Sequence, residues 1–285
     1  MIPRRIKRQS GRHALVDGIP FELPVSSDRT SALMAAFGID TAKAAALLPG
    51  NELHPARLWG RSLLLITVIN YTLTDIGKYI EFSVGIACTR GKGPAPRFLP
   101  FLLHRPFGFG QYVLDLPVST EISVKGGKGI WGMPKHQASL DFVVSDESVS
   151  SQYDKDGSFV LRIDIDRPRR ARFPLNLAAV NYCQFRGLLM KSYVYMKGTA
   201  AFALAPSASG RLVLGDDPRA RRIAELGVEQ KPLFTAFFPS STGVLDDHFE
   251  SWFVSSERPP ESEPEGFESV IGLGLGQDWP EPPQR

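Results

Sequence analysis

The sequence lacks several features that would assign it to a common class of protein. It contains only two cysteines, Cys88 and Cys183, and neither their spacing nor their apolar surroundings are typical of a disulfide framework or a metal site. It has no run of about 18 apolar residues, and no apolar stretch follows the basic N-terminus. We therefore expect two buried thiols in a cytoplasmic protein that does not enter a membrane.

Charge of one sign is not in excess either. The chain has 33 Lys and Arg residues against 30 Asp and Glu residues, which gives a net charge of +3. That balance is too even for a dedicated nucleic-acid binder, so we expect no nucleic-acid partner. We interpret the two basic runs, residues 4–13 and 167–173, as a solvated tail and a solvated loop.

Common motifs for cofactors, metals and nucleophilic serine are also missing. The stretch "KGGKG", residues 125–129, lacks the Ser or Thr that completes a phosphate-binding loop, and we interpret it as a flexible turn. The stretch "DDHF", residues 246–249, has metal-ligand residue types but no second cluster. No GxSxG motif occurs. We expect neither a metal nor a cofactor.

Patterns typical of helices are few and short. Ser27 or Asp28 can cap a helix that ends at Gly38, and Asp40 can cap an alanine-rich one that stops at Pro49. A third helix is predicted within residues 216–227, where acidic caps precede Pro218.

Most of the remaining chain is typical of β-strands. The predicted strands lie in 61–71, 79–89, 138–146, 148–166, 180–190, 192–206, 210–215 and 232–245. Asp156 and Gly157 predict a hairpin turn inside the fourth of these ranges.

The fold class expected from these elements is α+β and mainly β, with an antiparallel sheet closed into a barrel or folded into a sandwich. Closure removes exposed strand edges and provides a lined cavity. We divide the chain into a basic tail, residues 1–17, one barrel domain, residues 18–253, and a Pro/Glu/Gly-rich extension, residues 254–285. The proline-rich connection 90–110 is expected to be a lid or an oligomer contact.

The stretch "GKGIWGMPKH", residues 127–136, contains the residue of greatest chemical interest. Pro134 fixes the backbone before Lys135, and the large apolar side chains of Trp131 and Met133 lie beside it in sequence. Lysine in water carries a proton at neutral pH and cannot attack a carbonyl, whereas burial penalises the charged form. Lys135 is therefore a candidate nucleophile. The alternative is a lysine whose stem lies on Trp131 while its charge stays in water.

These residues resemble the acetoacetate decarboxylase family. The stretch "GKGIWGMPKH" is similar to the family's lysine motif, and "GKYIEF", residues 77–82, is similar to its Tyr-x-Glu element. The resemblance runs loosely from about Gly18 to Trp252. It implies a closed β-barrel or cone and a lysine that forms a Schiff base with a keto acid, a place that Lys135 occupies.

The resemblance also implies roles for neighbouring residues and for partners. Lys135, Glu81 and His136 are the candidate catalytic residues, and Trp131, Met133 and Tyr79 are the candidate substrate-binding residues. The implied enzyme is a lyase that uses no cofactor, acts on a small carbonyl compound and forms a homo-oligomer. The alternative for Glu81 is a solvent-facing strand residue, and for His136 a packed or exposed histidine.

Departures from the family pattern bear on the substrate. His136 stands where the family has a second lysine, and Lys128 and Gly129 stand where it has Arg-Glu. The family's N-terminal arginine falls in residues 17–23, which contain no arginine, and its second glutamate falls near Ile66, where no glutamate occurs. An iminium at Lys135 could still serve decarboxylation, aldol, retro-aldol or dehydration chemistry. The competing hypothesis is a barrel that binds a small apolar ligand without turnover.

Overall fold

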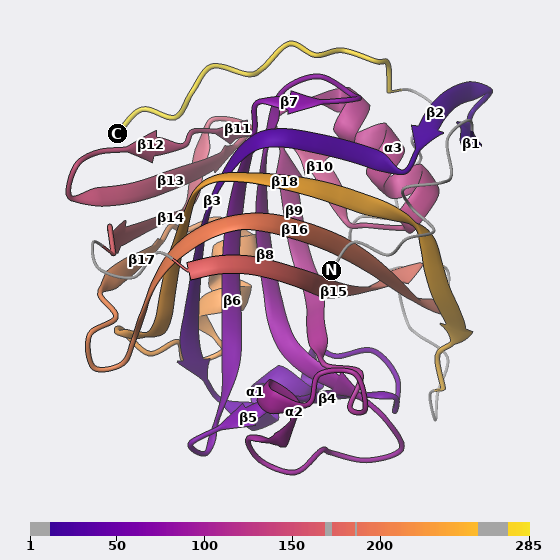
Figure 1. The fold of residues 1–285 in the computed structure, drawn as a ribbon. Helices are drawn as coiled ribbons and strands as arrows, with labels where there is room; N and C mark the ends of the chain where they lie inside the picture. The colour runs from indigo at the N-terminus through magenta and orange to yellow at the C-terminus, as the bar shows by residue number, and fades with distance from the viewer. Residues whose placement is uncertain (1–11, 169–172, 186, 256–272) are drawn as a thin grey trace.

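A closed barrel of seven strands forms the centre of the structure, a computed structural model that describes residues 12–168, 173–185, 187–255 and 273–285 (Figure 1). In order around the wall, its strands are β9 (Gly110–Val118), β15 (Phe173–Phe185), β16 (Leu188–Leu204), β18 (Pro232–Phe253), β3 (Val25–Ile39), β6 (Arg61–Tyr71) and β8 (Tyr79–Arg90). The wall closes where β8 pairs with β9. The expected barrel is therefore confirmed.

Short strands extend this wall at its edges. They are β10 (Lys135–Gln137) beside β9, β4 (Leu53–Pro55) beside β8, β5 (Arg57–Leu58) beside β6 and β7 (Leu73–Thr74) beside β3. A separate hairpin joins β1 (Arg12–Val16) to β2 (Ile19–Leu23). Residues 12–16 of the expected N-terminal tail thus take part in the fold.

The barrel is not wholly antiparallel, which corrects one part of the expected fold. β15 pairs with β9 in parallel at Asn181 and Gln111, and β10 also runs parallel to β9. Parallel neighbours need a long crossover connection, and the chain between β9 and β15 supplies one that contains a helix and most of a second sheet. Sequence patterns give strand positions but not the direction of pairing.

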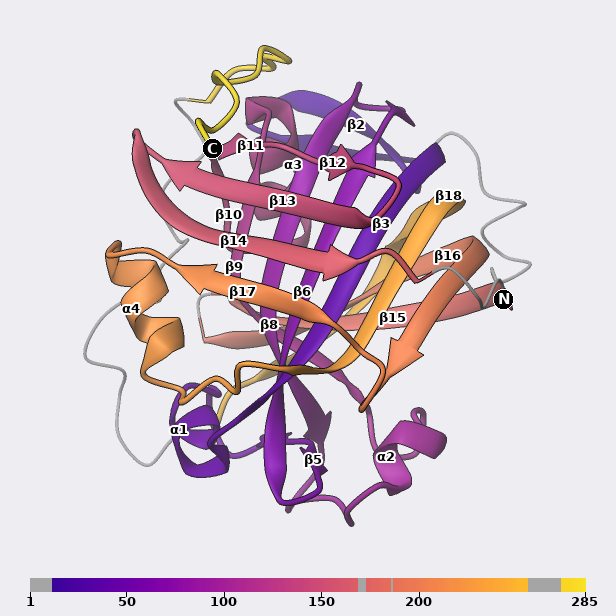
Figure 2. The same cartoon turned by 90° about the vertical axis from the view of Figure 1, so that its left-hand side faces the viewer.

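The second sheet packs on the outside of the barrel, in front of β3, β6 and β8 in Figure 2. Its strands are β11 (Ser139–Leu140), β12 (Val143–Val144), β13 (Ser148–Lys155), β14 (Ser158–Asp166) and β17 (Gly210–Leu214). The predicted hairpin turn joins β13 to β14, with positive φ at Asp156 and Gly157. The largest hydrophobic core lies between the two sheets and includes Phe82, Ile163 and Tyr153.

Four helices occur in the described residues: α1 (Thr41–Ala46), α2 (Leu99–Leu102), α3 (Glu121–Trp131) and α4 (Pro218–Ala224). The predictions for α1 and α4 are confirmed, including the side-chain caps of Asp40 and Asp217. In the same part of the chain, no helix is long and apolar enough to cross a membrane.

The helix predicted between Ser27 and Gly38 is wrong, because this segment is the barrel strand β3. Long ladders with β18 and β6 hold it in the sheet. One face of β3 packs in the large core and the other faces the barrel interior, so the segment shows no apolar and polar alternation. Its alanines then favour a helix in any prediction from local propensity.

The turn predicted at "KGGKG" is also wrong, because residues 125–129 lie inside α3. The glycines allow close packing on three sides of the helix. A Cβ added at Gly126 would lie 3.0 Å from a ring carbon of Phe21, and one at Gly129 would lie 2.8 Å from Cγ2 of Val16. Gly132 ends the helix in the left-handed conformation that glycine favours.

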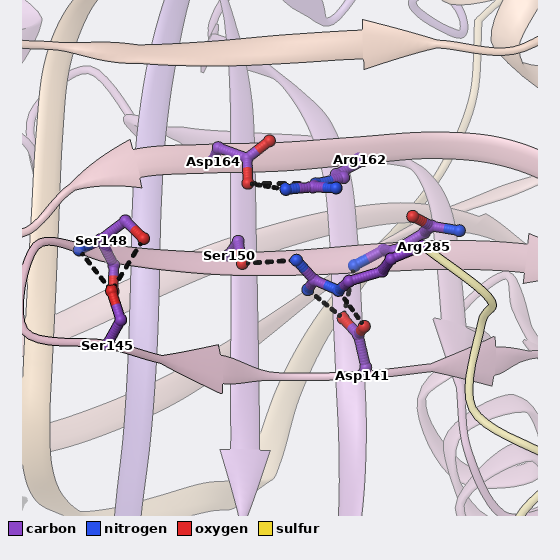
Figure 3. Close-up of polar contacts among 8 residues, drawn as sticks. Asp141, Ser145, Ser148, Ser150, Arg162, Asp164 and Arg285 are labelled. Carbon is purple, nitrogen blue, oxygen red and sulfur yellow. Dashed lines mark hydrogen bonds and ion pairs between the residues drawn. The ribbon is translucent and has the colours of Figure 1, made fainter.

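The last thirteen residues lie along the top of the molecule in Figure 1, over α3 and the second sheet. The carbonyl of Leu273 accepts a hydrogen bond from Lys125 of α3, at 3.0 Å. At the other end, the Arg285 guanidinium donates to both oxygens of Asp141 and to Ser150 (Figure 3). This part of the expected extension therefore contacts the barrel domain directly.

Candidate active site

The barrel encloses a cavity of about 240 Å³, which is lined mainly by apolar side chains. All seven barrel strands contribute to it. Representative lining residues, one from each strand, are Met34, Leu65, Glu81, Val113, Leu177, Met196 and Leu245. A mostly apolar cavity with a few polar groups is the usual form of a small-molecule site.

Strand alternation places Glu81 inside this cavity. Tyr79, Glu81 and Ser83 of β8 line the barrel interior, whereas Ile80 and Phe82 between them point outward into the large core. The Glu81 side chain is 15% exposed. The alternative interpretation of Glu81 as a solvent-facing strand residue is therefore not what the structure shows.

Lys135 begins β10 and directs its amine at Glu81 from the helix side of the cavity. Its side chain is 3% exposed and passes over Gly127 of α3, where a Cβ would lie 2.7 Å from the Lys135 Cε. Lys135 and Gly127 belong to the same sequence motif, eight residues apart. Because Gly127 has no side chain, the Lys135 stem can pass over it and reach the barrel interior.

The Lys135 amine has two close polar partners. Nζ lies 2.7 Å from Oε2 of Glu81 and donates a hydrogen bond of 3.0 Å to Oγ of Ser123, on α3. Nζ also lies 5.4 Å from the centre of the Tyr79 ring. The buried pair can exist as ammonium with carboxylate or, after transfer of one proton along the 2.7 Å contact, as amine with carboxylic acid. The second form contains a nucleophile.

Two tyrosines complete the network around Glu81. Tyr71 and Tyr79 stack with ring centres 4.5 Å apart, and Tyr79 is hydrogen-bonded to both Tyr71 and Ser123. Burial, followed by the Glu81 charge, raises the pKa of each tyrosine well above its ordinary value. Both phenols therefore keep their protons at neutral pH.

Cys183 lies close enough to this network for the charges of Lys135 and Glu81 to affect its pKa. Burial raises its pKa to about 12, with a smaller opposing effect of the Lys135 charge. Burial also raises the pKa of Cys88, in the large core. A buried protonated thiol is a poor nucleophile.

We therefore expect maleimide at pH 8 to leave both cysteines of the folded protein unlabelled. Both pKa values are raised, so both groups remain thiols until the pH approaches about 12 at Cys183. Intact mass measurement should show no adduct in buffer and two after unfolding in guanidinium. Rapid labelling of Cys183 in the native protein would contradict its burial.

His136 does not lie beside the amine, contrary to what its place in the sequence suggested. Consecutive strand residues point to opposite faces, so Lys135 enters the barrel while His136 points toward the second sheet. Its Nε2 lies 2.8 Å from Oδ1 of Asp115 and 3.2 Å from the Tyr153 oxygen. Tyr153 donates to the other oxygen of Asp115, at 3.2 Å.

We expect the variant His136→Gln to lose stability while retaining the chemistry of the site. Glutamine cannot reproduce both contacts of the ring, and a lost buried hydrogen bond to a charged group costs about 2 kcal/mol. The measurements are thermal unfolding and the rate at which the protein exchanges the oxygen of a ketone with isotopically labelled water. A large fall in exchange with unchanged unfolding would restore His136 to the catalytic set.

The three candidate substrate-binding residues divide into two groups. Tyr79 and Met133 line the cavity. Trp131 is not part of the lining, and its buried side chain packs in a small core with Leu23 and Leu116 behind the lysine motif. Trp131 thus supports the wall that carries Met133.

A polar cluster lies farther along the cavity from the amine. Gln111 of β9 donates 2.8 Å to Asn181 of β15 and 3.3 Å to Ser83 of β8. The Gln111 Oε1 is buried and has no hydrogen-bond partner in the described part of the protein. All three residues line the cavity.

Sequence reasoning did not identify Ser123, Tyr71 or the polar cluster as site residues. A helix predicted over residues 121–131 would have placed Ser123 and Gly127 on one face, at i and i+4. It would therefore have identified Ser123 as a site residue. Gln111 and Asn181 meet only because β9 and β15 pair in parallel. Across the described ranges, no three His, Cys, Asp or Glu side chains form a group that could hold a metal ion.

Comparisons with known proteins agree with this architecture. The sequence profile described as "Acetoacetate decarboxylase (ADC)" matches residues 6–184, more than half of the chain. No protein of the curated set matches by sequence.

Solved structures with the same fold include an acetoacetate decarboxylase from Legionella pneumophila, with 13% identity and a TM-score of 0.55 over 78% of this chain and 85% of that one. The enduracididine biosynthesis enzyme MppR, complexed with the condensation product of pyruvate and imidazole 4-carboxaldehyde, has 16% identity and a TM-score of 0.55 over 81% and 89%. An acetoacetate decarboxylase-like enzyme from Sphingomonas wittichii RW1 has 14% identity and a TM-score of 0.51 over 81% and 94%. At these identities the likeness concerns the fold.

Proposed function

This chain belongs to the acetoacetate decarboxylase family, and from that premise we propose a cofactor-independent enzyme that joins Lys135 to a small carbonyl compound as an iminium. The family match supports lyase chemistry in general. The observation that carries the finer proposal is the buried Lys135 amine, 2.7 Å from Glu81 at the wall of an apolar cavity.

The proposed step begins with proton transfer from the Lys135 ammonium to Glu81. The neutral amine then attacks the carbonyl carbon, a C–N bond forms, and the carbonyl oxygen becomes a hydroxyl group by taking a proton from the attacking nitrogen. Glu81 returns its proton to that hydroxyl, which leaves as water, and the nitrogen retains the positive charge as an iminium. The sum is ketone plus ammonium giving iminium plus water, so atoms and charge balance.

Ser123 and Tyr79 have positioning roles in this scheme. Ser123 accepts from the amine at 3.0 Å and so fixes the direction of Nζ before attack. The Tyr79 phenol, held protonated by burial, is hydrogen-bonded to Ser123 and so belongs to the same network. Once formed, the iminium withdraws electrons from the adjacent carbon, and Glu81 is the base that can move protons there.

The test is exchange of the ketone oxygen with isotopically labelled water, because exchange requires reversible iminium formation but no later bond cleavage. The wild-type protein should accelerate exchange for at least one member of a panel of ketones and keto acids. The variant Lys135→Met should not, whereas Lys92→Met, which changes an exposed lysine, should behave as wild type. Equal exchange by wild type and folded Lys135→Met across the panel would refute the proposal.

A second candidate function is a barrel that binds a small apolar ligand without turnover. The apolar lining of the cavity favours it as strongly as it favours an enzyme. Ketone binding that persists in Lys135→Met, combined with no exchange in wild type, would select this function instead.

A further inference from the structure

The charges around the cavity are few. Among the described residues that line it, Glu81 is the only carboxylate and none is an arginine or a lysine, while the Lys135 amine reaches Glu81 at the wall. His104 lies at the rim and is exposed. Arg29, between the lining residues Ser27 and Thr30 on β3, is itself exposed and does not line the cavity. Among the described residues, the interior thus holds one positive and one negative group.

These two opposite charges limit the charge that a substrate can carry into the cavity. After iminium formation, the positive nitrogen and the Glu81 carboxylate still neutralise each other. A substrate carboxylate would add a second negative charge in an apolar cavity whose described lining offers it no guanidinium or further ammonium partner. An unpaired buried charge is strongly unfavourable, so an uncharged carbonyl compound fits better.

The shape of the cavity indicates where the rest of such a compound lies. Ser83 is two residues from Glu81 on the same face of β8, which places the polar cluster about 7 Å farther along the wall. The wall facing β8 is apolar and includes Leu177, Val194 and Met196. At the far end, the Oε1 of Gln111 is buried and has no hydrogen-bond partner among the described residues, so a ligand hydroxyl or amide N–H that reaches it satisfies an unpaired acceptor.

We propose that the substrate is an uncharged ketone or aldehyde with an apolar chain of moderate length and a hydrogen-bond donor near its far end. The carbonyl carbon lies at Lys135 Nζ, the chain lies along Leu177 and Met196, and the donor contacts Gln111. This inference rests on the proposed iminium function and narrows it. A substrate without a carboxylate cannot be decarboxylated. The iminium then serves aldol or retro-aldol chemistry at a carbon–carbon bond, or dehydration at a carbon–oxygen bond.

The test is borohydride trapping on a matched series of methyl ketones, scored by the concentration that gives half-maximal adduct. Methyl pentyl ketone should trap at about tenfold lower concentration than acetone, because its chain is buried. Its analogue with a terminal carboxylate should need about a hundredfold more than the parent. Its analogue with a terminal hydroxyl should need less than the parent. A carboxylate analogue that traps as well as the parent, or better, would overturn the inference.

Variants of Gln111 provide an internal check that leaves Lys135 untouched. Gln111→Leu should remove the advantage of the terminal hydroxyl while preserving trapping of methyl pentyl ketone. Gln111→Lys should favour the carboxylate analogue, because it places an ammonium at the far end. Loss of the hydroxyl advantage in neither variant would contradict the assigned position of the donor.

Failure of the substrate inference can be separated from failure of the proposed function. Binding of the same ketones to Lys135→Met can be detected as a rise in the thermal unfolding temperature of the protein. This measures the affinity of the cavity for each compound without covalent chemistry. Trapping of carboxylates in preference to neutral ketones would leave the iminium function intact and overturn only the substrate class. Selective stabilisation by neutral ketones without any trapping in wild type would overturn the iminium function and leave the cavity preference standing.

Discussion

Replacing Glu81 by glutamine should slow ketone oxygen exchange by about a hundredfold or more, the usual contribution of a well-placed general acid or base. Glutamine keeps the size and polarity of the side chain, but it can neither take the proton from Lys135 nor return one to the leaving hydroxyl. The measurement is the exchange rate at saturating ketone, compared with wild type. A variant that exchanges at the wild-type rate would remove Glu81 from the mechanism.

The same substitution also has an expected effect on stability, which serves as its control. Breaking a buried ion pair from one side leaves the other charge without a partner and costs about 3 to 5 kcal/mol. Glu81→Gln and Lys135→Met should each lower the free energy of unfolding, and the double variant should lower it by less than the sum. Additive losses would show that the 2.7 Å contact between Lys135 and Glu81 contributes no coupling energy.

Replacing Gly127 by alanine should abolish most of the ketone oxygen exchange while leaving the protein folded. The new methyl group would occupy the space of the Lys135 stem, and the buried lysine can yield only by withdrawing from Glu81 and Ser123. Displacement of a reacting group by about 1 Å can cost about a hundredfold in rate. Alanine is also the better helix former, so the thermal unfolding temperature should change little.

Gly129→Ala is the matched control on the same helix. Its methyl group would meet Val16 of β1 instead of the lysine. We therefore expect Gly129→Ala to lower stability with near-normal exchange, the reverse of Gly127→Ala. If both variants lose activity equally, the effect belongs to α3 as a whole and not to the path of Lys135.

Much of the barrel could be predicted from the sequence because most strands carry β-branched or apolar runs between clear turns. The predicted segments 61–71 and 79–89 are examples, and both lie in strands. The errors at β3 and α3 have a common cause. In each, tertiary contacts outweigh local propensity, through two long ladders at β3 and through close approach of Phe21, Lys135 and Val16 to the glycines of α3.

Within the candidate site, the sequence singled out two residues that the structure brings into contact, but not their surroundings. Lys135 and Glu81 stand in short motifs, and the structure brings them to 2.7 Å. His136 was chosen for its adjacency, but adjacency in a strand places side chains on opposite faces. Ser123 depends on a helix that glycines concealed, and Gln111 meets Asn181 only through a parallel pairing that no local pattern encodes.

The most direct test of a covalent role for Lys135 is the position of a trapped adduct. Wild-type protein is reduced with borohydride in the presence of methyl pentyl ketone, digested, and analysed by peptide mass spectrometry. We expect a reduced adduct on Lys135 and none on exposed lysines such as Lys92. A protein that remains unmodified at Lys135 with every ketone and keto acid of the panel would contradict it.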